Sequence, residues 1–447
     1  MAEYLATGVL SEGDTFHREI KRVPAASRLS AGPGGVRVDR YWHPWSGPWT
    51  GSLKAGDLDA EFQRLFRRAV HATLADGLPS GVLLSGGPDS SGVLGMAAAL
   101  AREGALPGGR PRVALTAASE QLPQCDETAL ARETAALHGV PWRSVALEHI
   151  SPLHGLDRFL ERFGEPPCAG AFGLESCLFE EARSDGVRVL LDGYDADILF
   201  VPPFSYLWEL FRGLRWGRLA KEWVGLKRRH NFGLRRLTRD TLPPLAHRIY
   251  AAGRPRAPGW IRPHIRADLE DRLRPKPNRL SFEERTAERA LLADVGLKLE
   301  PTRALERLHG IERRHPYFDP RLVRFLFSIP LEDRFSGGET KILMRRSLAD
   351  LLTPTVRRRI HKTRYRTYFN RAWRQVLGPR LTALAEGRSS LLDAYIDRRL
   401  LYPTIRATLH GEPPDPVLWR MIGLERWLML RTGQRMEVRD YEDAYTP

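Results

Sequence analysis

Short apolar runs alternate with helical segments in the first half of the chain, and this alternation constrains the fold more than any other feature. The runs 82–84, 112–117, 142–147 and 187–191 are typical of short buried strands. Apolar residues at helical spacing follow the first two runs, over about 90–102 and 126–139. Such alternation predicts an α/β fold, in which helices cover both faces of a parallel sheet.

The rest of the chain shows no second series of this kind. Residues 1–57 are rich in Gly, Ser and Pro and are too few to form a core alone, so we expect an appendage. Residues 201–447 are mostly helical in pattern, with Pro and Arg breaks, and the basic stretch 251–266 is typical of a linker before a helical C-terminal lobe.

Composition restricts the partners and the compartment. The 69 basic residues exceed the 54 acidic ones, but only eight are lysines, so a general preference for arginine explains much of the excess and we expect no nucleic-acid surface. No apolar run reaches membrane-spanning length and the N-terminus lacks a secretory signal, which predicts a cytoplasmic protein without membrane contact. Cys125, Cys168 and Cys177 form no metal-binding spacing, which argues against structural zinc.

The stretch LLSGGPDSS, residues 83–91, joins the first apolar run to the helix expected from about Ser90. Two glycines let the backbone approach a ligand, and the N–H groups at a helix start bind anions. Asp89 would repel a bare phosphate unless a divalent cation joined the two. The stretch is neither a Walker A loop nor GxGxxG. It predicts a metal-assisted phosphate site, with a capped glycine turn as the structural alternative.

This stretch resembles the SGGxDS loop of ATP pyrophosphatases, and two further segments make the resemblance specific. They are VLLDGYDADILF (189–200) and the pair HGIERRHPYFDPRLVRFLFSIP (309–330) and KILMRRSLADLLTPTVRRRIHKTRY (341–365). Together they resemble the synthetase domain of the asparagine synthetase family, which includes β-lactam synthetases and lasso peptide cyclases. The similarity runs from about Asp57 to LWRMIGLERWLML (418–430). DGYDAD and this last segment look most like the cyclase and β-lactam branches.

The resemblance implies an adenine nucleotide α-hydrolase-like fold and amide formation with ATP and Mg²⁺, in which an amine displaces AMP from an acyl-adenylate. It assigns metal binding to Asp89 and Asp197 and charge stabilisation to Lys362, with Tyr194 as a second catalytic residue. Nucleotide binding falls to Leu84, Ser85, Gly86, Gly87, Asp89, Ser90, Asp192 and Gly193. Asp126 and Glu127 match a family pair, but acids favour helix N-termini, so we expect a structural role for them.

Three positions depart from the family pattern and bear on the substrate. Asp192 replaces a serine, so only its backbone role carries over. Tyr194 replaces the glutamate of asparagine synthetases and resembles β-lactam synthetase, in which a tyrosine helps to deprotonate an intramolecular amine; a partner acid is needed, and the sequence does not identify it. Ile198 stands where asparagine synthetases usually have an acidic residue, directly after the second predicted metal ligand. These changes favour amide formation within one molecule.

The opening of the chain also departs from the family, because Ala2 stands where a glutaminase nucleophile would be cysteine. Residues 1–57 resemble only the end of a glutaminase domain, which predicts a remnant of it at 1–57 and a ligase domain at 58–447, with the nucleotide-binding part at 58–200 and the helical part at 201–447. A truncated copy of a longer protein is the alternative.

We therefore expect a lasso-type macrocyclase that acts on a precursor peptide, or on another small carboxylate. A leader-peptide-binding protein and a peptidase are its possible further partners. Glutamine-hydrolysing asparagine synthase, a tRNA-modifying ATP pyrophosphatase and a non-enzymatic scaffold are the alternatives.

Overall fold

The computed structural model describes residues 1–433 apart from 9, 12, 44–56, 168–171, 195, 201–204, 242–256, 274–294, 361–365, 386–390 and 413–414. Residues 251–256 of the expected linker thus lie outside the described residues.

Five parallel strands form the central sheet in the order β5-β4-β3-β6-β7. Four of them lie where the apolar runs predicted strands: β3 (Ser80–Leu83), β4 (Ala114–Ala118), β5 (Trp142–Ala146) and β6 (Val189–Leu191). All three residues of β6 are fully buried, because helices cover both faces of the sheet. The predicted α/β fold is confirmed, and it matches the adenine nucleotide α-hydrolase architecture.

The fifth strand, β7 (Glu312–Arg314), comes from the half of the chain that was expected to be mostly helical. Its sequence is Glu-Arg-Arg, so it lacks the apolar run that marks the other strands. It pairs with β6 in parallel, Val189 opposite Glu312 and Leu191 opposite Arg314. The apolar runs did not predict this strand, because its buried residue Arg313 is held by ion pairs with Asp192 and Glu175 and is not apolar.

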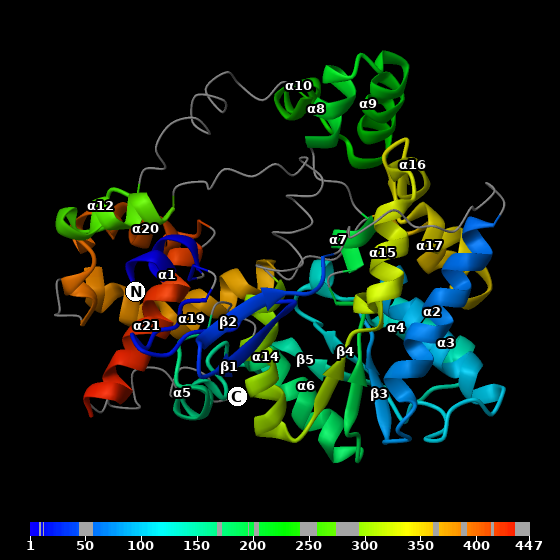
Figure 1. Ribbon diagram of the computed structural model, residues 1–447, viewed down its shortest axis with the longest axis horizontal. Coiled ribbons are helices and arrows are strands. Elements are labelled where there is room, and N and C mark those ends of the chain that lie inside the picture. The colour runs from blue at the N-terminus through cyan, green and yellow to red at the C-terminus, as the bar shows by residue number, and fades with distance from the viewer. Residues whose placement is uncertain are drawn as a thin grey trace.

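The two faces of the sheet belong to two different apolar cores, as Figure 1 shows for the helices on either side. Val189 and Leu191 contribute to one core and Leu190 to the other, as expected for alternating strand residues. The first core includes α2 (Leu58–Leu74), α3 (Pro88–Arg102), α4 (Thr128–His138), α15 (Pro320–Ser328) and α17 (Ile342–Ser347). The second includes α1 (Ala2–Thr7), α5 (Leu156–Phe163), α6 (Phe172–Ser184), α14 (Val295–His309) and α21 (Pro416–Thr432).

The beginning of the chain is part of the second core. Ala2, Tyr4 and Leu5 of α1 are buried with residues of α21, and the Tyr4 hydroxyl donates to the carbonyl of Pro167 at 2.6 Å. The antiparallel strands β1 (Ser27–Gly32) and β2 (Gly35–Arg40) follow and are largely exposed. The first helix is therefore anchored in the main body of the protein.

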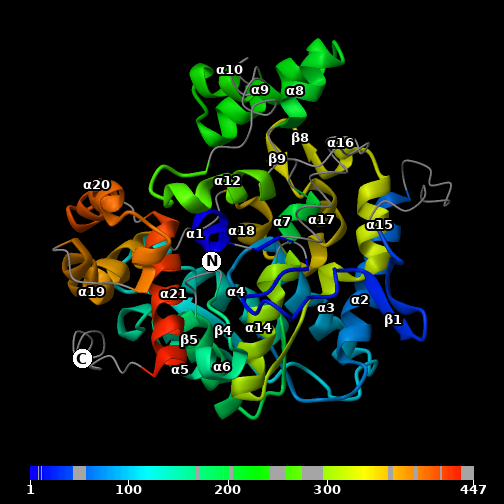
Figure 2. The ribbon, with the colours of Figure 1, turned by 60° about the vertical axis from the view of Figure 1, so that its left-hand side comes forward.

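The remaining helices surround this body. Three of them, α8 (Ser205–Arg212), α9 (Trp216–His230) and α10 (Leu234–Thr241), share a small apolar cluster and project at one end (Figure 2). The others are α7 (Ala196–Phe200), α12 (Pro263–Arg272), α16 (Leu331–Arg334), α18 (Pro354–Arg358), α19 (Arg366–Ala385) and α20 (Arg398–Leu409).

Short elements connect these helices. They are the strands β8 (Phe335–Ser336) and β9 (Glu339–Thr340) and the 3-10 helices at Pro123–Cys125, Leu147–His149, Pro316–Phe318, Ala349–Leu351 and Leu391–Ala394. Among the helices described, none combines the length and the apolar character needed to cross a bilayer.

Candidate active site

A cavity of about 450 Å³ lies where the loops after β3 and β6 meet. Ligands bind at this edge of a parallel sheet, beyond the carboxyl ends of its strands. The predicted site residues that line it are Leu84, Ser85, Gly87, Asp89, Ser90, Asp192, Gly193, Tyr194 and Asp197. Gly86 forms the same turn without lining the cavity, and Lys362 lies outside the described residues. The structure thus brings the two predicted loops together.

The turn after β3 is shaped by a glycine that no other residue could replace without strain. Gly86 has φ 60°, and a Cβ atom there would lie 2.7 Å from the Leu130 Cβ. The Ser85 N–H donates to the Ser90 hydroxyl oxygen at 3.1 Å, which closes the turn. The helix α3 begins at Pro88, two residues before the predicted start, so its free N–H groups belong to the turn itself.

The loop after β6 approaches the first turn closely, and a second glycine allows this. A Cβ atom on Gly193 would lie 2.7 Å from both the Asp89 Cβ and the Ser90 nitrogen. Because Gly193 has no side chain, the backbone of the second loop contacts the start of α3. This contact brings Asp89 near the first turn of the next helix, α7, which carries Asp197.

Lys341 joins the two predicted metal ligands, and sequence reasoning missed it. Its ammonium nitrogen lies 2.5 Å from an oxygen of Asp89 and 2.6 Å from an oxygen of Asp197. The residue is buried and has φ 61°, a left-handed backbone conformation that is unfavourable for residues other than glycine. Its position at the start of the resembling segment 341–365, in a chain with eight lysines, is the signal that could have found it.

Asp192 has a larger role than its backbone alone. Arg313 of β7 donates to its carboxylate at 2.6 Å, and His315 Nδ1 lies 2.7 Å from its other oxygen. Burial by itself would raise the pKa of Asp192, but the charges of Arg313 and His315 outweigh it and hold the pKa well below its usual range. Arg313 also donates to Glu175 of α6 at 3.0 Å. The sequence predicted only a backbone role for Asp192, whereas in the structure its carboxylate also pairs with Arg313 and His315.

Comparison with known proteins agrees with this geometry. The family model described as "Asparagine synthase" matches residues 61–429, which is most of the chain. The chain belongs to the asparagine synthase family. It is similar to a protein named asparagine synthetase [glutamine-hydrolyzing] 3 from Bacillus subtilis (strain 168), with 24% identity over 409 residues. That alignment covers 87% of this chain and 61% of the relative, so the chain spans less than two thirds of the relative's length.

Membership of the asparagine synthase family confirms the resemblance inferred from the sequence. The family implies the use of ATP.

Tyr194, one of the two predicted catalytic residues, lies in the wall of the cavity. Its ring centroid is 5.3 Å from that of His315, and the Arg313 guanidinium carbon is 5.4 Å from the ring centroid. The ring also meets Phe318 edge-on at 6.4 Å. Tyr194 is thus a packed aromatic residue whose neighbours include a buried cation.

Two arginines that were not predicted shape the other side of the cavity. Arg359 donates to the Gly86 carbonyl at 2.9 Å and to the Glu127 carboxylate at 2.7 Å. Glu127 therefore does more than begin a helix, since it orients a cation beside the anion-binding turn. Arg345 donates to the carbonyls of Arg357 and Arg359 at 2.6 and 2.7 Å. It fixes the chain that leads to the Lys362 segment.

Proposed function

We propose that this chain joins a carboxylate and an amine through an acyl-adenylate, with ATP and Mg²⁺, and that its substrate is a lasso-type precursor peptide that it closes into a ring. One observation carries the ligase part of this proposal. Asp89 and Asp197 meet around a single cationic group, directly beside a turn whose N–H groups suit phosphate. Two carboxylates that can hold a metal ion beside N–H groups that can bind phosphate suit a reaction in which pyrophosphate is released from ATP.

The two aspartates are suited to hold the metal. Their oxygens already coordinate the ammonium of Lys341 at 2.5 and 2.6 Å, which shows that the position between them favours positive charge. Magnesium prefers such oxygen ligands and usually binds through one or two carboxylates and the phosphates. When bound, it would neutralise charge on the departing pyrophosphate.

Other residues of the cavity would bind the rest of the nucleotide. Leu84, Leu115 and Ala117 at the ends of β3 and β4, together with Leu174 and Leu178 of α6, form an apolar wall suited to adenine. Lys341 and Arg359 place two cations beside the anion-binding turn. We assign Lys362 the role of stabilising negative charge on the adenylate, as the resemblance implies.

Tyr194 supports the intramolecular part of the proposal. Its phenol ring stands in the cavity wall, at the position where the resemblance gives asparagine synthetases a glutamate and β-lactam synthetases a tyrosine that helps to deprotonate an amine. We assign Tyr194 the same assistance in proton transfer from an attacking amine. An amine that belongs to the same peptide as the adenylate needs only to be held in position, which greatly accelerates attack.

Asparagine synthesis is the second candidate, since the Bacillus subtilis relative is named for it. The two candidates differ in the amine: a peptide N-terminus in the first and ammonia in the second. A single assay with both kinds of substrate separates them.

The test measures pyrophosphate release from ATP and Mg²⁺ with leaderless candidate peptides, with aspartate and ammonia, and with neither. We expect peptide-dependent release and a product lighter by one water. Asp89→Asn should lower the rate about 100-fold or more because it removes a metal ligand. The control Asp268→Asn changes an exposed carboxylate of α12 and should have no effect. Release only with aspartate and ammonia would favour the second candidate, and equal rates for Asp89→Asn and wild type would reject both.

A further inference from the structure

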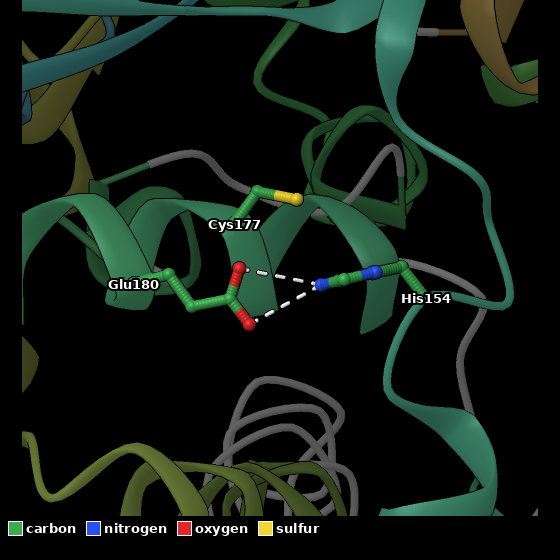
Figure 3. Close-up of side chains that lie close together, drawn as sticks. All are labelled: His154, Cys177 and Glu180. Atoms are coloured by element: carbon green, nitrogen blue, oxygen red, sulfur yellow. Dashed lines mark hydrogen bonds and ion pairs between the residues drawn. The ribbon is translucent and has the colours of Figure 1, made fainter. Parts of the chain in front are cut away.

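Three side chains with metal-binding atoms gather outside the active site, and the proposed function does not use them. His154 lies between β5 and α5, and Cys177 and Glu180 lie on α6. Their ligand atoms all lie within 4.8 Å of one another. His154 Nε2 is 3.2 and 3.3 Å from the two oxygens of Glu180 (Figure 3).

The chemistry of the three groups matches zinc. An imidazole nitrogen, a sulfur and a carboxylate oxygen are the donor types that Zn²⁺ binds at about 2.0–2.3 Å, which sets neighbouring ligand atoms about 3.3–3.8 Å apart. The separation of His154 from Glu180 is already close to this value. Both side chains are about half exposed, so small rotations can bring them to the sulfur. The group therefore needs little rearrangement to coordinate one ion.

A second histidine lies beside Glu180. His309, the last residue of α14, has its Nδ1 3.8 Å from an oxygen of Glu180. Burial lowers the pKa of His309, which favours the neutral imidazole that metals bind. Burial, and then the charge of Glu180, raise the pKa of the Cys177 thiol to about 11. A bound divalent ion reverses that preference, since a coordinating thiol loses its proton.

We propose that His154, Cys177 and Glu180 bind one zinc ion, with His309 or water at the fourth position. The sequence argued against structural zinc because the cysteines have no ligand spacing, but the fold brings the ligands together from separate segments. The proposal concerns a site distinct from the active site and does not depend on the reaction assigned above.

The site lies on the helix that forms one wall of the cavity. Leu174, Glu175 and Leu178 of α6 line the cavity. The helical period places Glu180 on a different side of the helix, whereas Cys177, three residues after Leu174, lies beside the cavity-lining side and packs in the same small apolar cluster as Leu174. A zinc ion would fasten α6 to the 151–155 turn and, through His309, to α14. Zinc therefore stabilises the part of the protein that carries the apolar wall and Glu175.

The test uses the full chain without a polyhistidine tag, stripped of metal with a chelator. Zinc is then titrated, and cobalt replaces it for absorption spectroscopy. We expect one equivalent of zinc, a rise in melting temperature, and a thiolate-to-cobalt charge-transfer band in the near ultraviolet. Cys177→Ser should abolish the band and weaken zinc binding at least about 10-fold. Loss of a group that only hydrogen-bonds to a metal ligand already reduces metal affinity by about that factor, and loss of a ligand should reduce it further.

Two variants serve as controls for this result. Cys168→Ser, at a position outside the described residues, should keep both the band and the affinity. His154→Gln should weaken binding as Cys177→Ser does while retaining the wild-type circular dichroism spectrum. Absence of the band in the wild type, its persistence in Cys177→Ser, or its loss in Cys168→Ser would overturn the proposal.

Discussion

Lys341→Met removes the cation that separates Asp89 from Asp197 and should make the protein depend on magnesium for its stability. The Lys341–Asp89 pair is buried, with side-chain exposures of 7% and 13%, whereas Asp197 is 39% exposed. Breaking a buried pair costs about 3–5 kcal/mol. The partly exposed Lys341–Asp197 pair adds at most about 1 kcal/mol to this cost. We therefore expect a loss of about 3–5 kcal/mol without metal, or a fall in the folding equilibrium constant of more than about 100-fold.

Methionine is the informative replacement because it keeps the unbranched, apolar part of the side chain without the terminal ammonium, so the difference reports on that charged group. Urea unfolding with and without Mg²⁺ measures the effect, and Lys221→Met on the surface of α9 is the control. Magnesium should restore most of the lost stability of Lys341→Met and change the control little. Equal responses of Lys341→Met and wild type to magnesium would refute the idea that the metal and the ammonium occupy the same place.

Two further variants test the loop contact and the buried ion network. Gly193→Ala puts a methyl group 2.7 Å from Asp89 and Ser90, so pyrophosphate release should fall about 10-fold or more; Gly217→Ala, with open space around it, should keep the wild-type rate. Arg313→Met leaves the Asp192 carboxylate buried with His315 as its remaining partner and should destabilise the protein by about 3–5 kcal/mol at pH 7.

The loss of stability expected for Arg313→Met should depend on pH. The native pKa of Asp192 is lowered, so its stabilising contribution is present above the ordinary value of about 4 and is lost as the pH falls. In Arg313→Met only His315 still opposes the effect of burial, so the native pKa of Asp192 should rise and the loss of stability should shrink as the pH falls from 7 towards 4. A loss that stays constant over this range would contradict the assigned pairing.

Much of the site follows from local sequence. Gly86 and Asp89 stand directly after one apolar strand, and Gly193 and Asp197 after another, so the topology of a parallel sheet is enough to bring them to one edge. Local sequence also predicted four of the five strands, because each of the four is a short apolar run.

The missed features depend on contacts between residues far apart in the chain. Nothing near Lys341 indicates that its ammonium lies between two aspartates. β7 has no apolar run, and its Arg313 is buried only because Asp192 and Glu175 neutralise it. Local pattern reasoning detects strands that are buried by apolar side chains, and it cannot detect one that is buried by ion pairs.

The late position of β7 also has a consequence for synthesis on the ribosome. Until Glu312–Arg314 have emerged, β6 is an open sheet edge and Asp192 lacks its cation; Lys341 follows later still. A nascent chain that ends before these residues exposes an unpaired strand and a group of repelling carboxylates, which are conditions that promote misassembly. The cavity between the loops after β3 and β6 can therefore form only late in translation, and chaperone demand should be highest just before β7 is added.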